Sequence, residues 1–328
     1  MRTSSASSCT VRADRVHSRV LRAGGWIAAL MCAIGGCDAV RPVPQPDGLP
    51  PDAAAVAEAQ RARLSAIPTL AMRGVAELRW ADGAGAHVED GDFELVLRAP
   101  LDTSLRVTKF GERVLWAGSG NGQWWLFEPK AQPSRVTVGA SDLPDGEDGL
   151  LALMRPAHLL ATLGLRPIEA SEVQEIVWDS RLGCWRALVR QGNSRMSVEL
   201  RHASLLPVGI DWLDAHGNVR VRSEMSVFAW PGSEESVTRP GALVPTRITV
   251  SMFDPPAEVA LVRDGRAPAP DATLALSAAP PTDGTARIRD RLFDFESLRA
   301  SLKPEVVERV GGAAAGVPPQ VAPEGDSP

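Results

Sequence analysis

The segment Val114-Leu-Trp-Ala-Gly-Ser-Gly-Asn-Gly-Gln-Trp-Trp-Leu-Phe-Glu-Pro129 predicts a β-hairpin. Apolar arms at 114–116 and 124–127 flank the run Gly118-Ser119-Gly120-Asn121-Gly122, and its Asn-Gly pair supplies the positive φ angles that a tight turn needs. Aromatic residues dominate both arms, and they suit a pleated, half-buried surface. Three of the nine tryptophans lie in this hairpin, so we expect it to form one wall of an apolar region.

Short stretches with a two-residue alternation lie on both sides of the hairpin. Because tight turns join them, we expect an antiparallel meander and a fold that is mainly β with some α (α+β). Asp254-Pro255-Pro256 is expected to end one of the strands, because proline cannot donate to a sheet ladder. The predicted strands are 75–80, 92–98, 105–110, 175–178, 184–189, 194–201, 208–213, 219–225 and 243–252, with further strands at 257–262 and 273–276.

Helices are predicted at three places. Asp52 is suited to cap a helix over 53–66, where apolar residues recur at helical spacing. The stretch 147–165 is apolar almost all round, so it is expected to be buried against the sheet, with Pro156 causing a kink or dividing two short helices. His158 within it is interpreted as a core histidine, with ligand contact as the alternative. Between Arg289 and Val310 we expect an extended piece followed by a short helix that starts at Pro304.

The N-terminus has the pattern of an export signal over residues 1–36. Five arginines precede an apolar run that extends from about Ala23 to Ile34. This run is shorter than the roughly 20 residues that span a bilayer, and it is typical of a signal-peptide core. The run ends in Ile34-Gly35-Gly36-Cys37.

These four residues resemble the lipobox of bacterial lipoproteins, in which a branched aliphatic residue and two small residues precede a cysteine. The resemblance implies cleavage before Cys37, acylation of Cys37 and a location at the periplasmic face of a bacterial membrane, inner or outer. A plain secretory signal with an incidental cysteine is the alternative. The proline-rich residues 37–52 are then a lipidated tether, 53–310 a single domain and 311–328 a disordered tail.

Charge and cysteine usage agree with this location. Removal of residues 1–36 leaves 30 basic and 39 acidic residues, so the formal net charge changes from −5 to −9. This balance argues against nucleic acid as a partner, and also against electrostatic docking on anionic lipid, so acyl chains must hold the protein on the membrane. Cys184 is then the one remaining free cysteine, expected to be buried and not catalytic.

Local catalytic and metal-binding motifs are absent from the sequence. The five histidines have no metal-ligand spacing, and no nucleophile elbow or phosphate loop occurs. The acidic residues Asp142, Asp145, Glu147 and Asp148 are interpreted as a solvated loop rather than a calcium site. We therefore expect no cofactor, no metal and no enzymatic activity. A hydrolase with a carboxylate pair distant in sequence is the less favoured alternative.

Three segments together resemble the LolA/LolB superfamily of lipoprotein carriers and receptors. They are GDFELVLRAPLDTSLRVTKFGERVLWAGSGNGQWWLFEP at 91–129, LPVGIDWLDAHGNVRVRSEMSVFAW at 206–230 and LVPTRITVSM at 243–252. The resemblance covers about Leu70 to Met252. It implies a curved antiparallel half-barrel with helices over its concave face, and acyl chains bound between sheet and helices.

The leading hypothesis is a lipid-anchored envelope protein that binds lipid, or the acyl chains of a lipoprotein, without catalysis. An apolar concave face under a removable apolar helix would form a dry pocket for lipid tails. An envelope scaffold or sensor that binds a protein partner is the alternative, and the aromatic residues would then be ordinary core. The candidate ligand-binding residues are Trp116, Trp124, Leu126, Leu160, Trp178 and Trp212.

Overall fold

The computed structural model describes residues 42–82, 85–100, 102–140, 155–192, 194–231, 243–263, 269–285 and 287–310. The contacts of the chain divide it into two units, Met1–Pro42 and Val43–Pro328, and every helix and strand below belongs to the second. The signal peptide, Cys37, the acidic cluster at 142–148 and the tail 311–328 lie outside the described residues.

Strands are the main element of the described part of the second unit, and few helices accompany them, which confirms the predicted mainly β class. The strands are β1 (Thr69–Asp82), β2 (Gly85–Arg98), β3 (Asp102–Lys109), β4 (Glu112–Gly120), β5 (Gln123–Glu128), β6 (Arg135–Ala140), β7 (Val173–Asp179), β8 (Cys184–Gln191), β9 (Ser194–Arg201), β10 (Pro207–Leu213), β11 (Val219–Ala229), β12 (Val244–Ala257), β13 (Ala272–Ala278) and β14 (Val306–Val310). The α-helices are α2 (Ala53–Ser65), α4 (Pro156–Thr162), α5 (Val259–Arg263) and α6 (Phe295–Leu302). Short 3₁₀ turns lie at Ala170–Glu172 and Asp290–Phe293.

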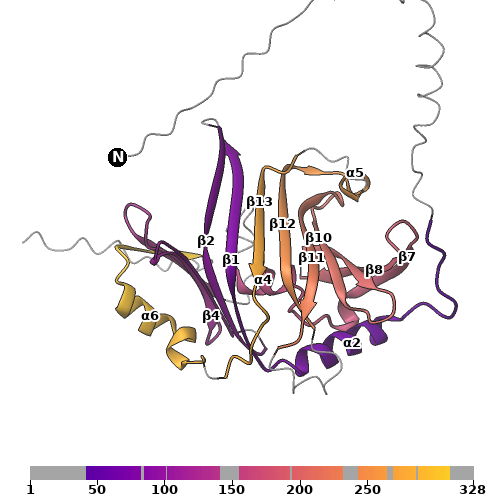
Figure 1. The fold of residues 1–328 in the computed structure, drawn as a ribbon, viewed down its shortest axis with the longest axis horizontal. Helices are drawn as coiled ribbons and strands as arrows, with labels where there is room; N and C mark the ends of the chain where they lie inside the picture. The colour runs from indigo at the N-terminus through magenta and orange to yellow at the C-terminus, as the bar shows by residue number, and fades with distance from the viewer. Residues whose placement is uncertain are drawn as a thin grey trace, which may run out of the picture. The chain divides into compact units, whose positions relative to one another are not determined.

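All fourteen strands belong to one open, curved sheet (Figure 1). Their order is β14-β6-β5-β4-β3-β2-β1-β13-β12-β11-β10-β9-β8-β7. Each pair is antiparallel except β14 with β6, which is parallel, so the sheet is mixed and not purely antiparallel. The two meanders β1–β6 and β7–β13 meet where β1 pairs with β13, from Gly74 opposite Ala278 to Trp80 opposite Ala272. The middle of the sheet therefore joins segments that are distant in sequence.

The tryptophan hairpin consists of β4 and β5, as predicted. Asn121 and Gly122 have φ angles of 52° and 74°, the left-handed values that this tight turn needs. Gly118 and Gly120 belong to strand β4 rather than to the turn. A Cβ on Gly120 would lie 2.0 Å from the Phe293 carbonyl oxygen, so this glycine is required by close packing.

Two of the apolar clusters lie on opposite faces of the sheet. We call the face with Leu105, Leu126 and Leu276 the inner face. Its cluster extends along the sheet and includes Val56 of α2 and Leu160 of α4. The opposite, outer face has a smaller cluster at β4–β6, covered by α6. Strand β5 contributes to both clusters because its successive side chains alternate between the two faces.

The C-terminal segment differs from the prediction. Helix α6 precedes Pro304 and does not start there. The Asp294 carboxylate caps it by accepting from the Glu296 amide at 3.2 Å, and Lys303 ends it with a φ of 48°. The β-branched residues after Pro304 then form β14, because the free edge of β6 offers a ladder of unpaired backbone groups.

Other boundaries also differ from expectation. The strand predicted over 257–262 does not form; Ala257 ends β12, and helix α5 follows over 259–263. Strand β12 continues past Asp254 to Ala257, because its pairing with β11 is irregular here and jumps from Met252 to Ala257, which leaves Pro255 and Pro256 outside the regular ladder. Strand β6 was missed. Pro156 stands at the start of α4 and causes no kink within it. Helix 53–66 is confirmed, with the Asp52 carboxylate accepting from the Ala55 amide at 2.7 Å.

Candidate functional site: an apolar cavity on the inner face

A cavity of about 280 Å³ lies between α4 and the inner face of the sheet. Its volume is near the lower end of the roughly 300–1,000 Å³ typical of small-molecule pockets. Strands β1–β5 and β13 form its walls, and Leu159 of α4 closes one side. The lining residues are Ala76, Leu78, Glu89, Asp90, Gly91, Phe93, Leu105, Val107, Lys109, Val114, Leu115, Leu126, Glu128, Leu159, Leu274 and Leu276.

The wall of the cavity is apolar and its charged residues are solvent-accessible. Phe93, Leu105 and Leu126 are buried, whereas the Glu89 side chain is 56% exposed and lies 3.3 Å from the Lys109 Nζ. The cavity therefore offers apolar contact along its depth and charged groups at its mouth.

A second, much smaller void of about 10 Å³ adjoins this cavity. The two share Phe93, Leu105, Leu159 and Leu276 as lining residues. Leu159 is the shared residue that belongs to α4, whereas the other three belong to the sheet.

The carboxyl end of α4 is fastened to β10 and β11. The Trp212 Nε1 donates to the Thr162 Oγ1 at 3.2 Å, and the Ser223 Oγ donates to the Thr162 carbonyl at 2.7 Å. The His158 ring packs edge-on against Trp212 with centroids 4.7 Å apart, and His158 is buried, which fits the core-histidine interpretation. These contacts fix the cover of the cavity at one end.

Helix α2 supports the same end of α4 through a buried arginine. Arg63 donates to the Gly164 carbonyl, and to the Leu243 carbonyl at 3.2 Å. Burial lowers the pKa of Arg63 to about 10. The Gly164 carbonyl, just after α4, thus accepts a hydrogen bond from a cationic side chain. Such a contact is stabilising at the C-terminus of a helix.

The six sequence-predicted residues do not form one site. Leu126 lines the cavity. Leu160, Trp124 and Trp212 belong to the inner-face cluster around α4 and do not line the cavity, and the Arg155 guanidinium lies 5.3 Å above the Trp124 ring. Trp178 is half-buried on the edge strand β7, where its Nε1 donates to the Val43 carbonyl at 3.0 Å.

Trp116 lies on the outer face, away from the other five residues. Alternation along β4 places Leu115 inward and Trp116 outward. The Trp116 Nε1 donates to the Ser104 Oγ at 2.8 Å. Its ring therefore belongs to the cluster under α6 and does not face the cavity.

Sequence reasoning missed most of the lining because it gave weight to tryptophan. Half-buried aliphatic residues, among them Leu78, Val107 and Leu274, form much of the wall. The alternation in β3 predicted the inward direction of Leu105 and Val107, so the signal was present.

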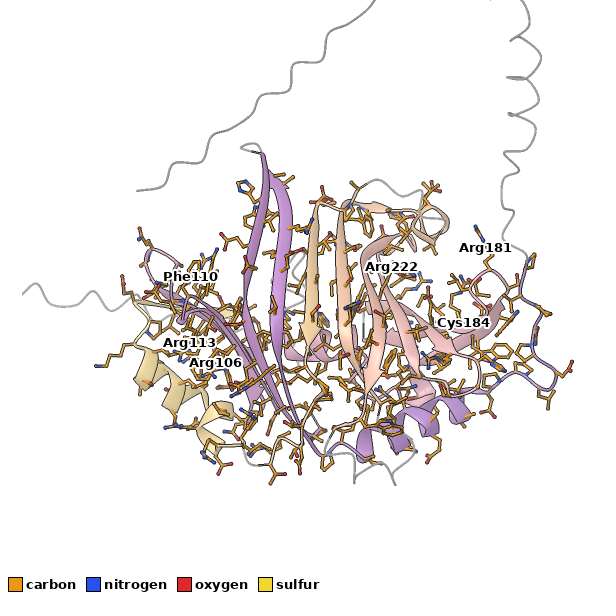
Figure 2. All side chains as sticks on the ribbon, viewed as in Figure 1. Arg106, Phe110, Arg113, Arg181, Cys184 and Arg222 are labelled. Atoms are coloured by element: carbon orange, nitrogen blue, oxygen red, sulfur yellow. The ribbon has the colours of Figure 1, made fainter. Side chains whose placement is uncertain are left out.

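Phe110 was also missed. It is 95% exposed at the tip of the β3–β4 turn, next to Lys109 of the cavity (Figure 2).

A buried ionic cluster lies on the outer face of β8–β11, away from the cavity. Arg222 contacts Asp211 at 2.8 Å, Glu199 at 3.2 Å and Glu224 at 2.9 Å. Burial raises the pKa of Asp211 to about 6, and Glu199 adds to this effect while Arg222 opposes it.

Burial likewise raises the pKa of the Cys184 thiol to about 12. This thiol is therefore protonated at neutral pH and poorly nucleophilic.

Within the described ranges, no group of three or more histidine, cysteine or acidic residues could hold a metal ion. The same part of the chain contains no helix with the length and hydropathy of a membrane span.

Comparisons with known proteins find similarity to solved structures but not to a family model or a curated sequence. No family model matches the sequence, and no curated protein matches it. A DUF1329 family protein from Desulfovibrio piger is 12% identical, with 76% of this chain and 100% of that chain covered and a TM-score of 0.46. A domain from Vibrio parahaemolyticus named for outer membrane lipoprotein sorting is 10% identical, with 76% and 97% covered and a TM-score of 0.45. A LolA superfamily protein from Nitrosomonas europaea is 12% identical, with 75% and 99% covered and a TM-score of 0.42.

Proposed function

We propose that this protein is a lipid-anchored cell-envelope protein that holds an acyl chain, from a lipid or a lipoprotein, in the inner-face cavity without catalysis. The observation that carries the proposal is the apolar cavity with charged groups at its mouth. Acylated Cys37 fastens the chain to the periplasmic face of a membrane.

The chemistry of the lining suits a lipid tail. Each buried methylene contributes about 0.8 kcal/mol, so affinity follows chain length, and the deep wall offers few polar groups that would select one headgroup. Lys109 and Glu89 at the mouth meet the polar end of the ligand. Phe110, which is exposed beside the mouth, gives the tail an apolar surface as it enters.

Helix α4 is the adjustable part of the site. Its carboxyl end is fastened through Thr162 and Gly164, whereas Leu159 lines both the cavity and the adjoining small void. A longer acyl chain displaces Leu159 and occupies both spaces. Trp124, Trp212 and Leu160 act in this proposal by holding α4, and Leu126 acts by contact.

A charge placed in the wall tests the proposal. Leu78 is half-buried and lines the cavity, so Leu78→Glu should leave the fold intact and lower the affinity for a fluorescent fatty acid. Exclusion of three methylenes costs about 2.4 kcal/mol, which is roughly a 50-fold loss. Val88→Glu is the matched control, because Val88 is 59% exposed and does not line the cavity. Equal affinity in the wild type and both variants would overturn the proposal and favour the protein-binding scaffold.

The hydrolase alternative has less support. Asp211 and Glu199 form a carboxylate pair on Arg222, but Asp211 is fully buried and the pair lies on the outer face. Neither residue lines the cavity. This pair is therefore out of reach of a substrate in the cavity, and the carboxylates that do line the cavity are Glu89, Asp90 and Glu128.

A further inference from the structure

The outer face of β1–β4 bears a row of charged side chains behind the cavity. Cross-strand pairing sets Arg73 opposite Glu94, Glu94 opposite Arg106, and Arg106 opposite Trp116. The Glu94 carboxylate accepts from the Arg73 Nε at 2.7 Å and also from Arg106. Arg287 adds a third guanidinium at 3.3 Å. Three arginines thus share one carboxylate.

A fourth arginine of this surface, Arg113, forms no ion pair with any described acidic residue. Arg113 lies on the next row, where Asp92 pairs with Thr108 and Thr108 pairs with Arg113. Two strand spacings, roughly 10 Å, separate the Asp92 and Arg113 backbones. The Arg113 guanidinium instead lies over the Trp116 ring, 4.5 Å from its centroid. Its Nε is buried, and no described residue accepts a hydrogen bond from it.

These rows border an open groove of about 440 Å³. Arg73, Glu94, Arg106, Asp92 and Thr108 are among its lining residues. With Arg113 and Arg287 beside it, the described residues at the Glu94 end of the groove include four arginines and two carboxylates, although the whole chain has a net charge of −5. The next row of this face adds the carboxylates Glu77 and Asp90, and Arg79 is paired with Glu77. Figure 2 shows Arg106 and Arg113 on the part of the sheet near α6. The positive charge therefore gathers at the end of the groove where Arg106 and Arg113 lie.

We propose that this groove binds a phosphate group, held chiefly by Arg106 and Arg113. A phosphate monoester has a charge of about −1.5 to −2 and three acceptor oxygens, which matches the positive excess and allows it to bridge guanidinium groups on two strands. A carboxylate has two oxygens in one plane and a single negative charge, so it matches several guanidinium groups on different strands less well. The site is on the opposite face from the acyl cavity and does not depend on it.

Calorimetric titration of the full chain in neutral detergent tests the site. The two probes are inorganic phosphate and glycerophosphoglycerol, the diester headgroup of a common anionic lipid. Arg113→Gln removes a side chain that forms no ion pair with a described residue and loses its contact with the Trp116 ring, so the melting temperature without phosphate should fall only slightly. Loss of one charged donor should weaken phosphate binding by about tenfold to hundredfold. Arg181→Gln, on the β7–β8 turn, is the control and should bind as the wild type does (Figure 2).

The outcomes separate the two sources of phosphate. Binding of inorganic phosphate alone, weakened in Arg113→Gln, assigns the groove to a free phosphate or monoester. Equal binding of the diester, with the same weakening, assigns it to a lipid headgroup. Failure of the wild type to bind either probe would overturn the proposal. So would binding that is the same in Arg113→Gln, Arg106→Gln and the wild type. Neither result depends on whether the cavity holds an acyl chain.

Discussion

Replacement of Asp211 by asparagine should stabilise the protein at neutral pH. Asp211 is fully buried and shares Arg222 with Glu199 and Glu224. Asparagine keeps an oxygen for the 2.8 Å hydrogen bond from the Arg222 Nη1. It removes one of the three negative charges around a single arginine, and with it the cost of burying that charge.

The magnitude follows from the pKa of Asp211. Burial raises this pKa from 3.8 to about 6 in the folded chain. Between these values the folded chain holds a proton that the unfolded chain has released, so the free energy of unfolding falls as the pH rises. A pKa difference of one unit corresponds to about 1.4 kcal/mol. The free energy of unfolding therefore falls by about 3 kcal/mol between roughly pH 4 and pH 7. Asp211→Asn should not suffer this loss.

Urea unfolding at a series of pH values, followed by tryptophan fluorescence, measures the effect. The advantage of Asp211→Asn over the wild type should be small near pH 4 and grow to about 3 kcal/mol near pH 7. Asp47→Asn, in the exposed proline-rich segment, is the control and should run parallel to the wild type at every pH. An advantage of Asp211→Asn that is constant with pH, or that shrinks as the pH rises, would refute the reasoning.

Four further predictions concern the supports of the fold and the anchor. Arg63→Met leaves the Gly164 and Leu243 carbonyls without their donor and should cost about 3 kcal/mol in the free energy of unfolding, measured by urea titration. Gly120→Ala forces a Cβ against Phe293 and should cost about 1–3 kcal/mol by the same measurement. Cys184, whose thiol pKa is about 12, should react with a maleimide only at the rate of unfolding. Cys37→Ser should shift the exported protein from the membrane fraction to the soluble fraction, as seen on immunoblots.

The local structure was largely predictable, because alternation and turn residues are encoded within a few positions. The hairpin of β4 and β5 and the Asp52 cap of α2 follow from such signals. The order of strands in the sheet was not predictable. Pairing of β1 with β13, about 200 residues apart in sequence, and of β14 with β6 depends on contacts that no local pattern encodes.

The sequence predicted an apolar pocket on one face of the sheet, but it did not predict most of the residues that line the candidate cavity. Tryptophans attract attention because they bury much area, yet a large ring fills space and so removes a cavity. Trp124 and Trp212 therefore pack around α4, whereas the cavity persists where Leu78, Val107 and Leu274 are too short to meet. Trp116 faces outward because it follows Leu115, which faces inward, and successive side chains of a strand point to opposite faces.

Native mass spectrometry gives the most direct test of the central claim, that the inner-face cavity holds an acyl chain. The chain that begins at Asp38 retains the whole compact unit from Val43 onward and lacks an acyl group of its own. Purified without detergent from a bacterial host, it should carry a discrete lipid that solvent extraction releases, and Leu78→Glu should carry much less. An empty wild-type protein that also fails to take up added fatty acid would contradict the account.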